Sequence, residues 1–118
     1  MEADKRACFA VVAATLVNKR AYNGVYDCHQ SKHLTISTSN ANTSNPEFYD
    51  HNRNHSVSGN DKSMYDYATS SHVSINVTGS TVDCYDYETS SSITFNVNGN
   101  NVDAYDFGTS SNYSYCVD

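Results

Sequence analysis

Two histidine pairs come closest to a chemical motif in this sequence. His29 and His33, with Cys28 beside them, and His51 and His55 each have the His-x3-His spacing of a zinc half-site. On a β-strand, however, residues four apart lie about 13 Å from one another, which is too far to share one ion. A zinc site would need loop geometry or ligands from two segments, such as Cys28 with His51. Degenerate repeat edges are the simpler explanation, and we expect neither a metal nor a cofactor.

The spacing of the residues shows no other catalytic motif either. The sequence offers no Ser/His/Asp order, no paired carboxylates placed for acid and base work, and no glycine-rich phosphate loop. We therefore expect a protein that is not an enzyme.

An aromatic pattern in the second half of the chain is the stronger candidate for binding. Three tyrosines that recur every twenty residues are each followed, two positions later, by a second aromatic residue. With two nearby aspartates on the same predicted face, this strip consists of Tyr65, Tyr67, Tyr85, Tyr87, Tyr105, Phe107, Asp83 and Asp103. The strip either packs beneath a second layer of sheet, or forms an exposed surface for a sugar or a protein, because Tyr supplies large contact area at low entropic cost.

The same tyrosines belong to an internal repeat that covers the whole chain. A Tyr-Asp pair recurs at spacings of 23, 16, 20 and 20 residues, and Thr-Ser-Ser follows the last three pairs at 69–71, 89–91 and 109–111. The pairs are Tyr26-Asp27, Tyr49-Asp50, Tyr65-Asp66, Tyr85-Asp86 and Tyr105-Asp106. These spacings predict one domain, residues 1–118, made of tandem units that end near each pair, with a partial last unit at 109–118.

Each unit has the pattern of a β-hairpin. Ile93, Phe95 and Val97 alternate with polar residues, and Asn98-Gly99 follows before a second alternating run. Asn-Gly between alternating runs favours a type I′ turn, because both residues tolerate positive φ. We therefore predict about ten short antiparallel strands. The predicted turns lie at Asn23-Gly24, Gly59, Gly79 and Gly99.

Two all-β architectures fit a twenty-residue hairpin unit. In a β-solenoid the aspartates of successive units would stack about 4.8 Å apart, which like-charge repulsion opposes. An antiparallel meander places a Ser/Thr-rich strand between successive aspartates and roughly doubles that distance. We therefore predict a meander that is rolled or two-layered, with the β-solenoid as the alternative.

Charge and hydropathy divide the chain into unlike halves. The net charge is −6, but residues 1–62 carry seven cations against six acids, whereas residues 63–118 carry seven acids and no Lys or Arg. Direct binding to nucleic-acid phosphates is therefore not expected.

The apolar run Ala7–Val17 is too short to span a membrane, and Glu2 and Asp4 weaken its likeness to a signal peptide. We expect this run to form a core strand or a short helix.

Localisation stays open at this point. The absence of a convincing signal peptide favours the cytoplasm by default, whereas the Ser-, Thr-, Asn- and Tyr-rich composition is typical of cell-surface or extracellular proteins. The four cysteines have no CxxC pair and are expected to be reduced.

Self-assembly is the first functional hypothesis. The last strand carries Tyr113, Tyr115 and Val117 but lacks the partner strand of its unit, and an unpaired edge invites another chain. A strand around Phe9 and Val11 is the expected partner, which would give a head-to-tail homo-oligomer or filament.

Two alternatives remain open. One is a carbohydrate- or protein-binding module that uses the aromatic strip, and the other is a small acidic inhibitor whose regularly spaced aspartates mimic the phosphates of a nucleic acid.

Overall fold

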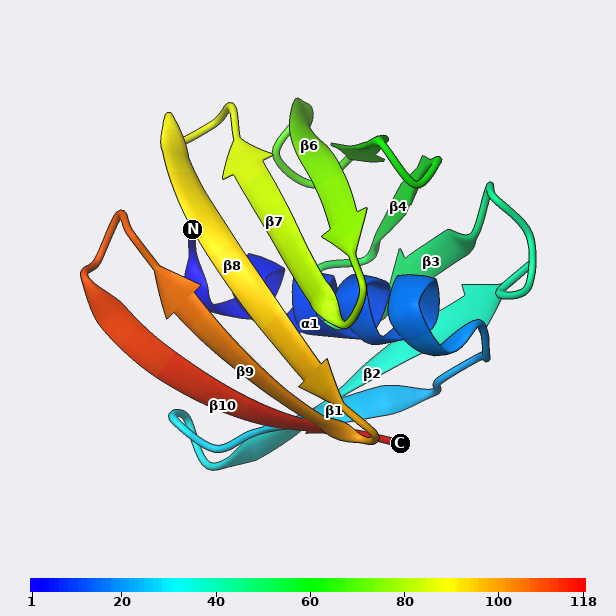
Figure 1. Cartoon of the computed structure of the whole chain (residues 1–118), viewed down its shortest axis with the longest axis horizontal. Helices are drawn as coiled ribbons and strands as arrows, with labels where there is room; N and C mark the ends of the chain where they lie inside the picture. The colour runs from blue at the N-terminus through cyan, green and yellow to red at the C-terminus, as the bar shows by residue number, and fades with distance from the viewer.

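The computed structural model describes all residues, 1–118, and contains one helix and ten strands joined by turns and loops (Figure 1). The elements are α1 (Ala3–Asn18), β1 (Gly24–Asp27), β2 (Lys32–Ser39), β3 (Glu47–Asp50), β4 (His55–Gly59), β5 (Ser63–Asp66), β6 (Ser71–Thr78), β7 (Thr81–Asp86), β8 (Ser91–Asn98), β9 (Asn101–Asp106) and β10 (Ser111–Val117).

The ten strands form a closed antiparallel barrel. Strands that follow one another in the sequence are neighbours in the sheet, and β10 pairs with β1 to complete the ring. The all-β prediction is confirmed. The β-solenoid is wrong because all neighbouring strands are antiparallel, and the rolled or two-layered meander is replaced by a barrel that has no free edge.

The closure explains how the partial last unit is completed. Strand β1 pairs with β10 in the register Val25↔Val117, Tyr26↔Cys116 and Asp27↔Tyr115. The second strand of this unit, which the C-terminus lacks, is therefore supplied by the N-terminal part of the same chain. An N-terminal strand does pair with the last strand, as the sequence suggested, but within one molecule and through residues 24–27.

Helix α1 fills the lumen of the barrel (Figure 1). Eight strands already give a barrel interior just wide enough for side chains to fill, so ten strands leave a wider space that needs further material. The helix is apolar on every side, which is the pattern of a fully buried helix, and its residues from Lys5 to Leu16 are all buried. The predicted strand around Phe9 and Val11 is therefore wrong, and the alternative of a short helix is confirmed.

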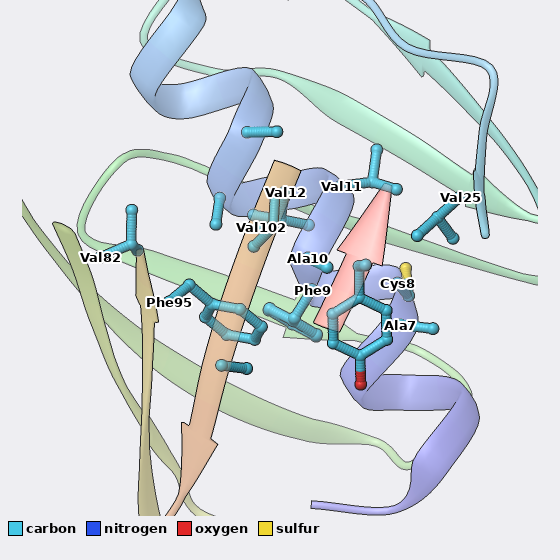
Figure 2. Packing of buried hydrophobic residues seen from close by; sticks show 14 of the residues in the cluster. Ala7, Cys8, Phe9, Ala10, Val11, Val12, Val25, Val82, Phe95 and Val102 are labelled. Carbon is cyan, nitrogen blue, oxygen red and sulfur yellow. The ribbon is translucent and has the colours of Figure 1, made fainter. Parts of the chain in front are cut away.

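Small side chains let the helix and the barrel wall approach each other. Ala7, Ala10 and Ala13 are fully buried, and Phe9 packs in the same cluster as Phe95 of β8. Figure 2 shows the labelled side chains of α1 surrounded by residues from several strands of the wall. The apolar run of the sequence is thus the centre of the hydrophobic core.

The hairpin register is shifted by two residues from the one that the predicted Asn98-Gly99 turn implies, in which Val97 would pair with Asn100. Val97 pairs with Val102 and Asn98 with Asn101, so the loop consists of Gly99 and Asn100. Gly99 has φ +60° and Asn100 does not have positive φ, which matches a type II′ turn rather than type I′. The shift is an even number of residues, so every side chain stays on its predicted face.

Two predicted turns differ from the prediction. Gly59 is the last residue of β4 and pairs with Met64, so the turn follows it at residues 60–62. The other predicted turn is absent. Asn23-Gly24 does not form a hairpin turn, because Gly24 is the first residue of β1 and pairs with Thr35. A side chain at Gly24 would collide with the His33 ring and the Leu34 carbonyl oxygen, so close packing between strands requires glycine here.

Candidate functional site

Five equivalent turns lie at one end of the barrel, each directly after a Tyr-Asp pair. The aspartates end the odd-numbered strands and point into the barrel, where all are 0% exposed: Asp27, Asp50, Asp66, Asp86 and Asp106. In each turn one carboxylate oxygen accepts a hydrogen bond from the backbone N–H two residues later. The repeated aspartate is thus a turn-forming residue of the Asx type.

Cations of the N-terminal segment neutralise part of the charge of this ring of five buried aspartates. The Lys5 ammonium lies 2.9 Å from Asp86 and 3.8 Å from Asp66, and it is completely buried. The Arg6 guanidinium lies 3.3 Å from Asp106, and the amino group of Met1 lies 2.9 Å from the same carboxylate. The first turns of α1 therefore bind the helix to the acidic end of the lumen.

A loop supplies the remaining cation. Arg53 contacts Asp50 at 2.6 Å and Asp66 at 2.8 Å. Burial by itself lowers the pKa of the Arg53 guanidinium, but the hydrogen bonds to Asp66 and Asp50, together with the charge of Asp66, raise the pKa above its usual value. Asp27 has no cation and instead accepts a hydrogen bond of 2.6 Å from the Gln30 amide. The five aspartates therefore belong to a buried ion-pair network and do not form an exposed acidic surface.

This ion-pair network was not predicted from the sequence, although a signal for it was present. The strand parity that places Ala104 in the core also places Asp106 there, and the same holds for the other four aspartates. Buried carboxylates need cations. Lys5 and Arg6, which precede the apolar run of α1, were the cations within reach.

The predicted aromatic strip lies on the outer face of the barrel, and no second layer of this chain covers it. Tyr67, Tyr87 and Phe107 are 51%, 60% and 58% exposed. Each packs edge-on against the tyrosine two residues before it, with ring centroids 4.7 to 4.9 Å apart. The predicted strip residues Asp83 and Asp103 are also exposed. Their carboxylates accept hydrogen bonds from hydroxyl groups of β8 and β10.

The three most exposed aromatic residues occupy the same place in successive units. The backbone N–H groups of Tyr67, Tyr87 and Phe107 donate to carbonyl oxygens at 3.1, 3.2 and 3.0 Å. The acceptors belong to the preceding even-numbered strands and are Ser56 of β4, His72 of β6 and Ser92 of β8. Each aromatic side chain is therefore held beside the outer face of a strand rich in Ser, Thr and Asn.

Shallow grooves lie at these three places. The groove over β2 to β4 includes Tyr67, the groove over β5 and β6 includes Tyr87, and the groove over β6 to β8 includes Tyr85 and Phe107. Their volumes are about 620, 680 and 760 Å³ respectively. Serine is the commonest lining residue, with Thr, Asn, His and acidic side chains adding further hydrogen-bonding groups. Each groove thus combines an aromatic surface with hydroxyl, amide or imidazole groups.

The histidines and the cysteine of the predicted half-sites are spread over the surface. His29 packs against Tyr113, His33 contacts Asp118 at 3.1 Å, and His51 contacts the Ser37 hydroxyl at 2.7 Å. His55 lies on β4 and Cys28 follows β1, both exposed. No group of three or more His, Cys, Asp or Glu side chains is arranged to hold a metal ion. All four cysteines are free, with Cys8 and Cys84 buried and Cys28 and Cys116 exposed.

The residues of the predicted assembly edge lie inside the barrel. Tyr113, Tyr115 and Val117 face the lumen from β10, and Phe9 and Val11 belong to the central helix. Strand β10 pairs with both β9 and β1. The open edge that was expected to recruit another chain is therefore occupied within the molecule.

Comparison with known proteins adds no family assignment. No protein-family model, curated protein or solved structure matches this chain. The structure contains no helix with the length and apolar character needed to cross a membrane.

Proposed function

We propose that this protein is a non-enzymatic binding module that takes a carbohydrate on the outer aromatic strip of its barrel. The observation that carries the proposal is the threefold occurrence of one arrangement, in which an uncovered aromatic side chain lies beside a groove lined with hydrogen-bonding groups. Large exposed aromatic surface on a soluble domain marks interaction sites. Its repetition on a rigid wall supports binding rather than chance exposure.

The chemistry of the grooves favours a sugar over a protein surface. A sugar ring offers one face of C–H groups, which can stack on the face of a Tyr or Phe ring, and a rim of hydroxyl groups. The Ser and Thr hydroxyls and the Asn amides beside the aromatic side chains can both donate and accept hydrogen bonds to that rim. Protein hot spots use Trp and Arg as well as Tyr, whereas the strip offers Tyr and Phe without any Trp or Arg.

The other two hypotheses lose the features on which they rested. Head-to-tail assembly required a free edge strand, and the barrel has none. Mimicry of nucleic acid required an exposed row of aspartates, but the five repeated aspartates are buried, and four of them contact a cation.

The test is a panel of immobilised neutral and acidic glycans, probed with labelled protein. We expect binding to neutral glycans that a triple variant, Tyr67→Ala, Tyr87→Ala and Phe107→Ala, loses. Tyr26→Ala is the matched control, because Tyr26 is 41% exposed on the same outer face but has Cys28, not an aromatic residue, two positions later. Binding that is absent from the panel, or that survives in the triple variant, would contradict the proposal.

A further inference from the structure

The three grooves form one path across the outside of the barrel. The groove with Tyr87 and the groove with Phe107 share Ser74 of β6 as a lining residue. Tyr65 joins the other end, since its ring lies 4.7 Å from Tyr67 and 4.8 Å from His72. Aromatic and polar side chains thus succeed one another without a break from β4 to β9.

The spacing along this path is regular. The residues Tyr67, Tyr87 and Phe107 follow β5, β7 and β9, and each of these strands is separated from the next by one strand. Neighbouring strands lie about 4.8 Å apart, so successive aromatic positions are about 10 Å apart at the barrel wall and somewhat farther at the ring tips. This separation is comparable with the length of a disaccharide in an extended glycan.

The charge of this wall selects among glycans. The exposed carboxylates of Asp83 and Asp103 lie on the strip, and Glu88 lies in the turn after β7. The chain has no Lys or Arg after Lys62. Glycans that carry carboxylate or sulfate groups would be repelled, whereas neutral sugars can donate hydroxyl hydrogen bonds to these carboxylates.

From the continuity, spacing and charge of this path we infer that the ligand is a linear neutral glycan that crosses the strands and occupies the three grooves at once. This inference rests on the proposed function and specifies its ligand. Occupying linked subsites with one chain raises affinity without any new kind of contact, because the second and third contacts become intramolecular. A short sugar would instead fill each groove separately.

The experiment is calorimetric titration of the full chain with cello- and chito-oligosaccharides of two, four and six units. For at least one series we expect Kd to fall by about tenfold or more from two units to six, with the stoichiometry falling toward one oligosaccharide per protein. The Tyr87→Ala variant removes the middle position. It should weaken six-unit binding by about tenfold, while the Kd of the two-unit sugar at the remaining grooves stays unchanged.

The Tyr26→Ala variant is the control and should bind all lengths as the parent does. A Kd independent of length, or six-unit binding unaffected by Tyr87→Ala, would overturn the inference. If neither series binds and the panel shows only branched or charged glycans bound through the strip, the extended neutral ligand is wrong and the proposed function stands. If the panel shows no binding to any glycan, both fail.

Discussion

Replacing Lys5 by Met tests whether the ion-pair network at the end of the lumen holds the fold together. The side chains are similar in length, so packing is nearly conserved while the charge is removed. Asp86 has no other cation within reach, and it keeps only the Glu88 N–H at 3.1 Å and the Thr89 hydroxyl at 3.2 Å. Breaking a buried pair from one side costs about 3–5 kcal/mol, because a buried charge is left uncompensated. For a domain of this size, that corresponds to a Tm lower by roughly 10–20 °C.

The measurement is urea unfolding followed by tyrosine fluorescence, together with thermal unfolding followed by circular dichroism. Lys32→Met is the control, because Lys32 is 46% exposed, and its contact with Asp4 should contribute less than about 1 kcal/mol. Combining Lys5→Met with Asp86→Asn should recover part of the loss, with a coupling of about 1–3 kcal/mol. If Lys5→Met unfolds at the same urea concentration as Lys32→Met, the buried network does not stabilise the fold as described.

The turn at Gly99, the buried thiols and the closure of the barrel each have a measurable effect. Gly99→Val should lower the free energy of unfolding in urea by about 1–2 kcal/mol, because the backbone φ of Gly99 is +60°. Asn101→Ser should have little effect, and equal urea midpoints for the two variants would contradict the turn geometry. Burial raises the pKa of the Cys8 and Cys84 thiols. An aromatic disulfide reagent at pH 8 should therefore label only Cys28 and Cys116 in the native protein, and all four cysteines in denaturant. Four fast-reacting thiols in the native protein would contradict the burial. Deleting residues 112–118 removes most of β10 and should abolish cooperative unfolding, whereas a truncated chain that still melts sharply would show that closure is dispensable.

The sequence allowed the strands and their faces to be predicted, because strand parity is a local property. The alternation at Ile93, Phe95 and Val97 gave the inner face correctly, and the even shift in register did not disturb it. The position of the turn depended on which residues around Gly99 take positive φ, and several registers satisfy that pattern. A pattern of alternation fixes faces more firmly than it fixes pairing.

The role of the N-terminal segment could not be settled from local pattern. The run Ala7–Val17 is short and apolar on every side, so periodicity does not distinguish a buried strand from a buried helix. The choice follows from the width of a ten-stranded lumen, which requires a filling element. That width is known only once closure is known.

The closure itself follows from the way the repeat is divided between the two ends of the chain. The first Tyr-Asp pair lies on β1, which has no even-numbered strand of its unit before it, and β10 has no odd-numbered strand after it. Joining the two halves within one chain makes five complete units and satisfies both edges at once, whereas joining two molecules at a single junction would leave one edge open at each end of the assembly. Closure also turns the Asp residues of all five units toward one enclosed space, where the cations of α1 and Arg53 contact four of them and Gln30 donates to the fifth, Asp27. The same geometry turns the aromatic residues of the units outward, so the internal charge network and the exposed aromatic strip are two faces of one repeated turn.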